Sequence, residues 1–297
     1  MFWLWTACMT GGSKPQSRIN VTDSADPTEE PTDSAVDSGL GEVDLCDAIY
    51  LLELSNTYSS EYIWRYDINT HAYELMGQLA CPKEIPGDYL VALSADSKGL
   101  LWAISDQSDV YAIRNDTLDC SYTQIRASSS QPPFIGRSLA FMRQDSEAED
   151  ELFFSGLNQY PPTNSTPAVI ARKYENGVSN ITTIPTLIGN DAFIDLAGTA
   201  DGRLFGLRPN GAQTAIIEID PDGGTVIQEW PTAAPAPRGW SFVWHSNSFW
   251  LFVSPDASST SVYHFDPSAH VLTLANTLPY QVVGAALPAC AEDNSGS

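Results

Sequence analysis

The sequence has little positive charge. Lys and Arg together number 14 against 37 Asp and Glu, which gives a formal net charge of -23 over 297 residues. Such a surface repels nucleic acid and an anionic membrane face, and no run of basic residues offers a local exception. We therefore exclude nucleic acid as a partner and expect the acidity to serve solubility, or the attraction of cations or of a basic partner.

Helical periodicity and known catalytic motifs are also missing. No window repeats apolar residues at helical spacing between start and stop signals. No G-x-S-x-G, phosphate-binding loop, dinucleotide fingerprint or C-x-x-C pair occurs. The chain instead holds 20 Gly, 20 Pro, 12 Tyr, 11 Phe and 8 Trp. This composition is typical of short strands joined by tight turns, and it predicts an all-β protein.

The amino terminus has the pattern of an export signal. An apolar stretch leads to two small residues, Thr6 and Ala7, and then to Cys8. This pattern resembles the end of a bacterial lipoprotein signal, a family in which the cysteine thiol receives a diacylglycerol and becomes the new amino terminus. Trp5 stands where that family prefers Leu, and the apolar stretch is shorter than the usual length of about 7–15 residues. The interpretations left open are an upstream start, a truncated chain and an incidental cysteine.

The segment that follows lacks large apolar residues. Residues 9–44 are dominated by Gly, Ser, Thr, Pro, Asp and Glu, so they cannot bury enough surface to offset their ordering entropy. We expect a disordered acidic linker at 9–44, a folded domain at 45–291 and a tail at 292–297. The resemblance to lipoproteins implies a location at the outer membrane or cell surface, on the periplasmic or extracellular face, with membrane contact only through the lipid. We also expect the protein to be a monomer.

Residues 45–291 repeat one pattern five times. Each copy has a polar turn, a strand of alternating apolar residues, a loop and a second strand that ends in an acidic or Asn-bearing turn. These closing turns start near residues 67, 115, 175, 220 and 266, so the spacings are 48, 60, 45 and 46. A period near 45 with four strands per unit predicts a β-propeller of five four-stranded blades. A two-sheet sandwich is the alternative, and the long third unit leaves the blade count open by one.

The first and last units complete each other. A further strand opens each unit near residues 88, 137, 192, 240 and 281, but the last of these has no strands after it. The first unit has strands at 48–54, 61–67 and 73–79 and lacks such an opening strand. We therefore expect the carboxyl-terminal strand to join the amino-terminal blade, which closes the ring and removes exposed sheet edges.

Four cysteines remain besides Cys8. An even number in an exported chain predicts disulfides. Cys290 ends the last inner strand and Cys46 begins the next strand of the same blade, so a Cys46–Cys290 bond would latch the ring. Cys81–Cys120 then follows by exclusion. Buried free thiols are the alternative.

The repeats have a recognisable consensus. Asp-x-x-Gly-x-Leu-Trp/Phe-Ala/Gly occurs around Asp96 and Asp201, before a second strand that ends in an acidic turn. It resembles repeats of secreted bacterial β-propellers and of predicted lipoproteins with an acidic linker ahead of such a domain. The resemblance covers residues 45–291 and implies the fold alone, because propellers host lyases, lactonases, glycosidases and binding scaffolds alike.

Propellers bind ligands at the end of the central channel where the inner strands begin. The polar residues expected at this mouth are Asp88, Arg137, Asn190, Asp191, Arg238, Gln281 and, from an inner strand, His245. Carboxylates, guanidinium groups and an amide suit a polar ligand such as a sugar or a peptide. The alternative is that they are solvated loop ends, with Arg–Asp pairs holding neighbouring blades together.

These observations favour a binding or scaffold module for a polar small molecule, a glycan or a protein. A periplasmic or extracellular lyase or hydrolase is the alternative, and it requires Asp88, Asp191 and His245 to converge as an acid–base set. A structural subunit of an envelope complex is the third hypothesis. We assign no catalytic or metal-binding residues and expect no cofactor. Ca²⁺ stays open as an alternative, since residues 220–224 resemble a calcium loop but are better explained as a turn.

Overall fold

The computed structural model describes residues 48–55, 60–83, 85–145, 147–235 and 237–288. Within these ranges the regular structure is β-strand, apart from one short 3-10 helix, η2 (Gly189–Ala192). No helix in this part of the chain has the length and apolar character needed to cross a membrane. Four expectations concern residues outside the described ranges. They are the signal remnant with Cys8, the linker at 9–44, the Cys46–Cys290 bond and the tail.

The strands of the described residues form five antiparallel sheets, which are the five blades. In each blade the strands are named from the centre of the ring outward. The first has β21 (Val282–Ala286), β1 (Ala48–Leu54), β2 (Glu61–Asp67) and β3 (Tyr73–Gln78). The second has β4 (Leu90–Ala95), β5 (Leu101–Ser105), β6 (Asp109–Ile113) and β7 (Cys120–Arg126). The third has β9 (Pro133–Met142), β10 (Glu151–Leu157), β11 (Pro167–Tyr174) and β12 (Gly177–Ile188), with β8 (Ser128–Ser130) added beside β9. The fourth has β13 (Asp195–Gly198), β14 (Leu204–Asn210), β15 (Gln213–Ile219) and β16 (Val226–Pro235). The fifth has β17 (Gly239–His245), β18 (Ser248–Ser254), β19 (Thr260–Asp266) and β20 (Val271–Leu278).

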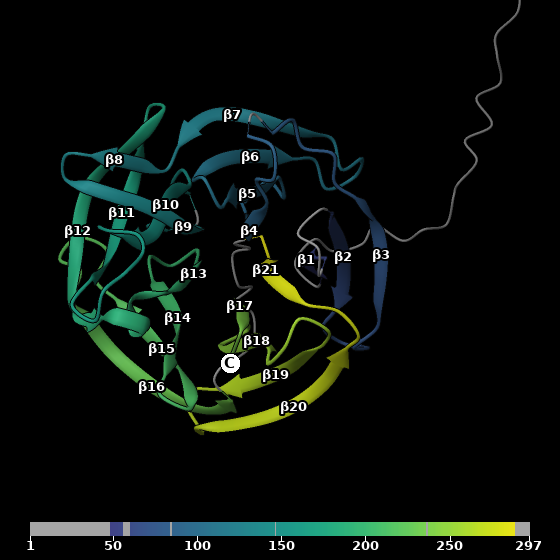
Figure 1. Cartoon of the computed structure of the whole chain (residues 1–297). Helices are drawn as coiled ribbons and strands as arrows, with labels where there is room; N and C mark the ends of the chain where they lie inside the picture. Colours follow the sequence, from purple (N-terminus) through teal and green to yellow (C-terminus); the bar gives the residue numbers. More distant parts are fainter. Residues whose placement is uncertain (1–47, 56–59, 84, 146, 236, 289–297) are drawn as a thin grey trace, which may run out of the picture. The chain divides into compact units, whose positions relative to one another are not determined.

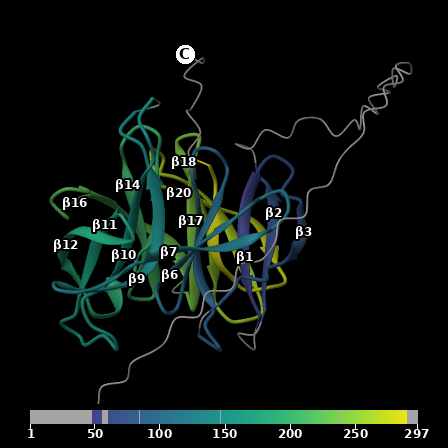
Figure 2. The same ribbon diagram turned by 90° about the horizontal axis from the view of Figure 1, so that it is seen from above.

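The blades close into a ring, as expected. The inner strands β21, β4, β9, β13 and β17 gather round the centre in that order, and each contacts the next, with β17 returning to β21 (Figure 1). Strand β21 pairs with β1 through Tyr50–Ala286 and Leu51–Ala285, so the carboxyl-terminal strand completes the first blade. Figure 2 shows the ring from the edge, where β17 and β18 lie side by side. The predicted five-bladed propeller is confirmed, and the sandwich is wrong.

The third blade differs from the expected four strands. The short strand β8 pairs with the start of β9 through Ser128–Ile135 and Ser130–Pro133, which makes this sheet five-stranded. Its outer strand β12 is also 12 residues long. The β8 addition lies before the closing turn near residue 175 and contributes to the length of the third repeat, whereas β12 follows that turn.

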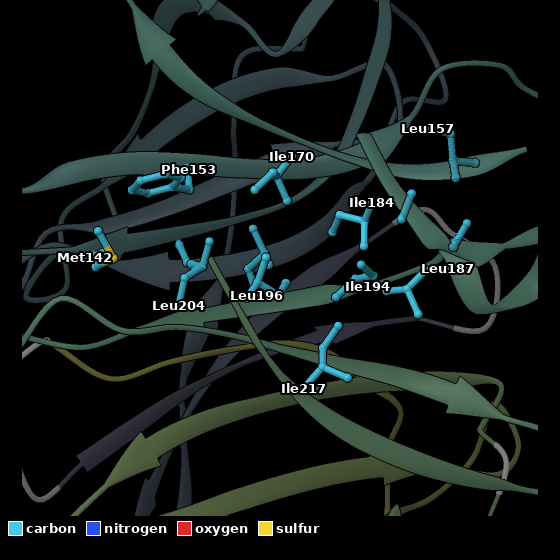
Figure 3. Close-up of a cluster of buried hydrophobic side chains, with 14 residues drawn as sticks. Met142, Phe153, Leu157, Ile170, Ile184, Leu187, Ile194, Leu196, Leu204 and Ile217 are labelled. Atoms are coloured by element: carbon cyan, nitrogen blue, oxygen red, sulfur yellow. The ribbon is translucent and has the colours of Figure 1, made fainter. Parts of the chain in front are cut away.

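Apolar side chains fill the spaces between neighbouring blades. Between the third and fourth blades, Phe153 and Ile170 face Leu196, Leu204 and Ile217, and all are buried (Figure 3). Full burial of one such side chain stabilises the fold by about 1.5–3 kcal/mol. The strand alternation read from the sequence thus turns one side chain in two towards the neighbouring blade.

The acidic turns that mark the repeats are structural. The Asp67 carboxylate accepts the N–H groups of Asn69 at 2.9 Å and Thr70 at 2.8 Å, and hydrogen bonds of this kind, that from Thr70 foremost, hold its pKa below the ordinary value. In the calcium-like loop, Asp220 accepts the Asp222 N–H at 3.0 Å in the same way. These carboxylates fix the turns by accepting backbone donors.

The Cys81–Cys120 disulfide is present, with its Cα atoms 4.9 Å apart. It connects the segment after β3 to the first residue of β7, so it links the first blade to the second. The pairing predicted by exclusion is confirmed.

Candidate functional site

A cavity of about 300 Å³ opens where the five inner strands begin. Every blade contributes to its wall. Representative lining residues, one from each inner strand, are Val91 of β4, Arg137 of β9, Asp195 of β13, Trp240 of β17 and Val283 of β21. The loop between β10 and β11 adds Tyr160, whose side chain is 56% exposed at the rim. The cavity therefore lies at the mouth of the central channel.

Arg137 is held in place on two sides. Its Nη1 donates to the backbone carbonyl of Asp106 at 2.7 Å and also to the Asp106 carboxylate. Its guanidinium carbon lies 4.6 Å from the centre of the Tyr160 ring, which is a cation–π contact. The Nε atom is buried and has no hydrogen-bond partner among the described residues. Arg137 is thus oriented by a loop of the second blade and by the Tyr160 loop of its own blade.

Two other polar side chains in the wall are unengaged. Arg238 is exposed, and its guanidinium has no hydrogen bond or ion pair within the described ranges; only its backbone N–H is used, by the Ser254 carbonyl at 2.8 Å. The Gln281 side chain is 9% exposed, and its amide likewise has no partner there. A free cation and a free amide therefore face the cavity.

The floor of the cavity is a buried carboxyl. Asp195 accepts the Ser138 hydroxyl on one oxygen and the Ser241 hydroxyl on the other, both at 2.6 Å. Ser138 in turn accepts the Leu196 N–H at 3.0 Å. Burial raises the pKa of Asp195 to about 6, against the opposing effect of the serine hydroxyls. The three side chains come from β9, β13 and β17, so this hydrogen-bonded set connects three blades.

Sequence reasoning missed this set. Ser138, Asp195 and Ser241 each directly precede two apolar residues in an inner strand, and so occupy equivalent places in three successive repeats. A hydrogen-bonding residue recurring at one place in otherwise apolar strands was the available signal. Since inner strands meet at the channel, such residues come together there.

The structure separates the other predicted site residues. Asp88 precedes β4 but does not line the cavity, and it is 5% exposed with a pKa raised by burial. The Ser105 hydroxyl opposes that shift, although neither Asp88 oxygen has a hydrogen bond of normal geometry within the described residues. Asn190 and Asp191 lie in η2, before β13, and their side chains are not described.

His245 lies far from the cavity. It ends β17, six residues beyond Gly239 in the cavity wall, which is a distance of about 20 Å along a strand. There its ring contacts the Ser246 hydroxyl at 3.1 Å. Asp88 and His245 therefore do not converge, and the acid–base set required by the enzyme hypothesis is not assembled.

No metal centre is evident in the part of the chain that the structure describes. No group of three or more His, Cys, Asp or Glu side chains there is placed to hold a metal ion. In the calcium-like loop the Asp220 carboxylate is used in the turn, as described above, and the Asp222 carboxylate pairs with Arg172.

Comparison with known proteins identifies similar folds only. No family model matches the chain, and no curated protein matches its sequence. A protein of unknown function from Bacteroides caccae is similar with a TM-score of 0.43 and 13% identity, over 78% of this chain and 73% of that one. A calcium-binding regucalcin from Agrobacterium tumefaciens has a TM-score of 0.39 and 9% identity, over 77% and 73%. An α-L-arabinofuranosidase from Fusarium graminearum has 0.41 and 11%, over 70% and 69%. Likenesses this distant say nothing about the ligand of this chain.

Proposed function

We propose that the protein is a binding module that takes a small polar ligand in the cavity at the channel mouth. The observation that carries this proposal is the pair of unengaged polar side chains, Arg238 and Gln281, in a cavity whose wall also contains Tyr160, Trp240 and Phe193. An apolar and aromatic wall with a few convergent polar groups is the usual composition of a ligand site. The cavity volume of about 300 Å³ matches the lower end of the usual range of about 300–1,000 Å³.

Binding is favoured over catalysis by the state of the acidic group in the wall. Among the described residues that line the cavity, Asp195 supplies the carboxyl, and both of its oxygens are occupied by serine hydroxyls. A general acid or base must reach the substrate proton within hydrogen-bond distance, with an oxygen available for it. Asp195 serves the structure of the floor instead.

We further propose that this module is exported and tethered through a lipid on Cys8. The support is the lipoprotein-like pattern at Thr6, Ala7 and Cys8 and the Cys81–Cys120 disulfide, since such bonds persist mainly in oxidising compartments. Metabolic labelling with palmitate in a bacterial host tests it. The full chain is expected to take up label, and Cys8→Ser is expected to abolish it; equal labelling of both, or of neither, refutes the tether.

The binding function is tested by thermal unfolding of the full chain against oligosaccharides and short peptides. A ligand present at a hundredfold excess over its Kd stabilises the protein by about 2.7 kcal/mol. Val283→Trp places a large ring in the cavity wall and is expected to abolish the shift. Thr273→Trp, an equally bulky change on the exposed outer strand β20, is the matched control and keeps it. If Val283→Trp folds, by far-ultraviolet circular dichroism, and still shows the full shift, the ligand binds elsewhere.

A further inference from the structure

The arginines around the cavity differ in their partners. Two guanidinium groups line it, those of Arg137 and Arg238. Arg137 is already neutralised, because the Asp106 carboxylate forms an ion pair with it. Asp195 in the floor has both oxygens engaged by serine hydroxyls. Within the described ranges, Arg238 is thus the cation of this wall that has no ion-pair partner.

One unpaired guanidinium matches one carboxylate of a ligand. A carboxylate can accept two parallel N–H bonds from the planar guanidinium, which is the strongest common pairing of these groups. A phosphate monoester carries about -1.5 to -2 charges at neutral pH, so it would bring surplus negative charge close to Asp106 and Asp195. The chain as a whole, at -23, offers no general attraction to offset that surplus.

The remaining wall indicates the body of the ligand. Tyr160 and Trp240 offer aromatic faces, and the Trp240 indole N–H is already donated to the Leu207 carbonyl at 3.1 Å. A flat or ring-shaped body packs well against such faces. The Gln281 amide can donate to and accept from a hydroxyl or amide on that body.

From this we propose, resting on the proposed binding function, that the ligand is a monoanion about one ring in size whose single carboxylate pairs with Arg238. The probes are two matched series, each with a carboxylate, a neutral compound and a phosphate monoester. They are benzoate, benzamide and phenyl phosphate, and glucuronate, glucose and glucose 6-phosphate. Binding to the full chain is measured by saturation-transfer NMR and by the fluorescence of Trp240 and the other tryptophans. Each probe is titrated to about 20 mM, which detects a Kd near 1 mM.

In at least one series, the carboxylate is expected to bind about tenfold more tightly than its neutral and phosphate counterparts, a difference of about 1.4 kcal/mol. Arg238→Gln is expected to reduce the affinity of the carboxylate to that of the neutral compound. Arg114→Gln is the matched control, because Arg114 is an exposed arginine paired with Asp116 on an outer turn. It is expected to leave the preference unchanged.

The outcomes separate this proposal from the binding function. If the neutral or phosphate probe of a binding series binds wild type as tightly as the carboxylate, the monoanion proposal is wrong while the ligand cavity stands. If the preference survives in folded Arg238→Gln, the carboxylate is held elsewhere and the proposal is also wrong. If none of the six probes binds wild type, the monoanion proposal is wrong, and the ligand cavity is judged by the oligosaccharide and peptide panel with Val283→Trp.

Discussion

The buried carboxyl of Asp195 makes a quantitative prediction about stability and pH. Its pKa is raised from 3.8 to about 6 by burial, so the folded protein prefers the protonated form more than the unfolded chain does. The stability it contributes is therefore fully present below the unfolded pKa and is lost as pH rises through the folded pKa. A difference of about two pKa units corresponds to about 3 kcal/mol in total. Roughly 2 kcal/mol of this falls between pH 4.5 and pH 7.5.

Asp195→Asn removes the titration while keeping the shape of the side chain. The amide oxygen can accept one of the hydroxyls of Ser138 and Ser241, and the amide nitrogen can donate to the other. Whatever the packing cost, it is the same at both pH values. The free energy of unfolding of the variant, relative to that of wild type, is therefore expected to rise by about 2 kcal/mol from pH 4.5 to pH 7.5.

Urea unfolding followed by tryptophan fluorescence at the two pH values measures this gain directly. Asp256→Asn is the matched control, because Asp256 is an exposed turn residue whose pKa is lowered, foremost by the Ser258 N–H, so it titrates below this pH range. The difference in free energy of unfolding between Asp256→Asn and wild type is expected to be the same at pH 4.5 and pH 7.5. If the difference for Asp195→Asn were equally independent of pH, the raised pKa of Asp195 would be refuted.

Two further predictions concern the links between blades. Cys81→Ser opens the loop closed by the bond to Cys120, with a sequence separation of 39, and is expected to cost about 3–4 kcal/mol on the chain-entropy account. Urea midpoints with and without reductant check this, and wild type whose midpoint reductant leaves unchanged would contradict it. Gly284→Ala puts a Cβ 2.6 Å from the Leu93 backbone nitrogen and is expected to cost about 1–3 kcal/mol by overpacking. The control is Gly77→Ala, because its added Cβ meets only the end of a flexible Leu118 side chain. Equal melting temperatures for the two variants would contradict the prediction and show that β21 and β4 can separate at little cost.

Much of the architecture could be predicted because it is encoded locally and repeatedly. Strands such as β2 and β19 alternate buried and less buried residues. The turns at Asp67, Asp220 and Asp266 each supply their own hydrogen-bond acceptor. Such signals act over a few residues, and five copies of them reinforce one another. The closure by β21 followed from counting, since one strand too few at the start matched one too many at the end. The extra strand β8 escaped prediction because its three serines carry no apolar alternation.

The candidate site was predictable in place but not in detail. That polar side chains meet at the channel mouth follows from the start points of the inner strands, and Arg137 and Arg238 do line the cavity there. The sequence alone could not tell which of the two arginines is neutralised, because the partner of Arg137 is Asp106, in a loop of a different blade. The prediction for His245 was wrong because inner strands begin at the mouth and His245 is the last residue of β17, at the other end of the strand.

By itself, then, the sequence predicted the β-propeller and its closure, because these depend on local periodicity and strand counting. It also gave Cys81–Cys120 as the bond that remains if Cys46 pairs with Cys290. Only the tertiary structure decided that Asp195 is the floor of the cavity and that Arg238 is the unneutralised cation in the described part of its wall. Ser138, Asp195 and Ser241 span about a hundred residues of the chain and meet only because three inner strands stand side by side. Whether a charge is buried, paired or left open is set by such distant neighbours, and no local pattern records them.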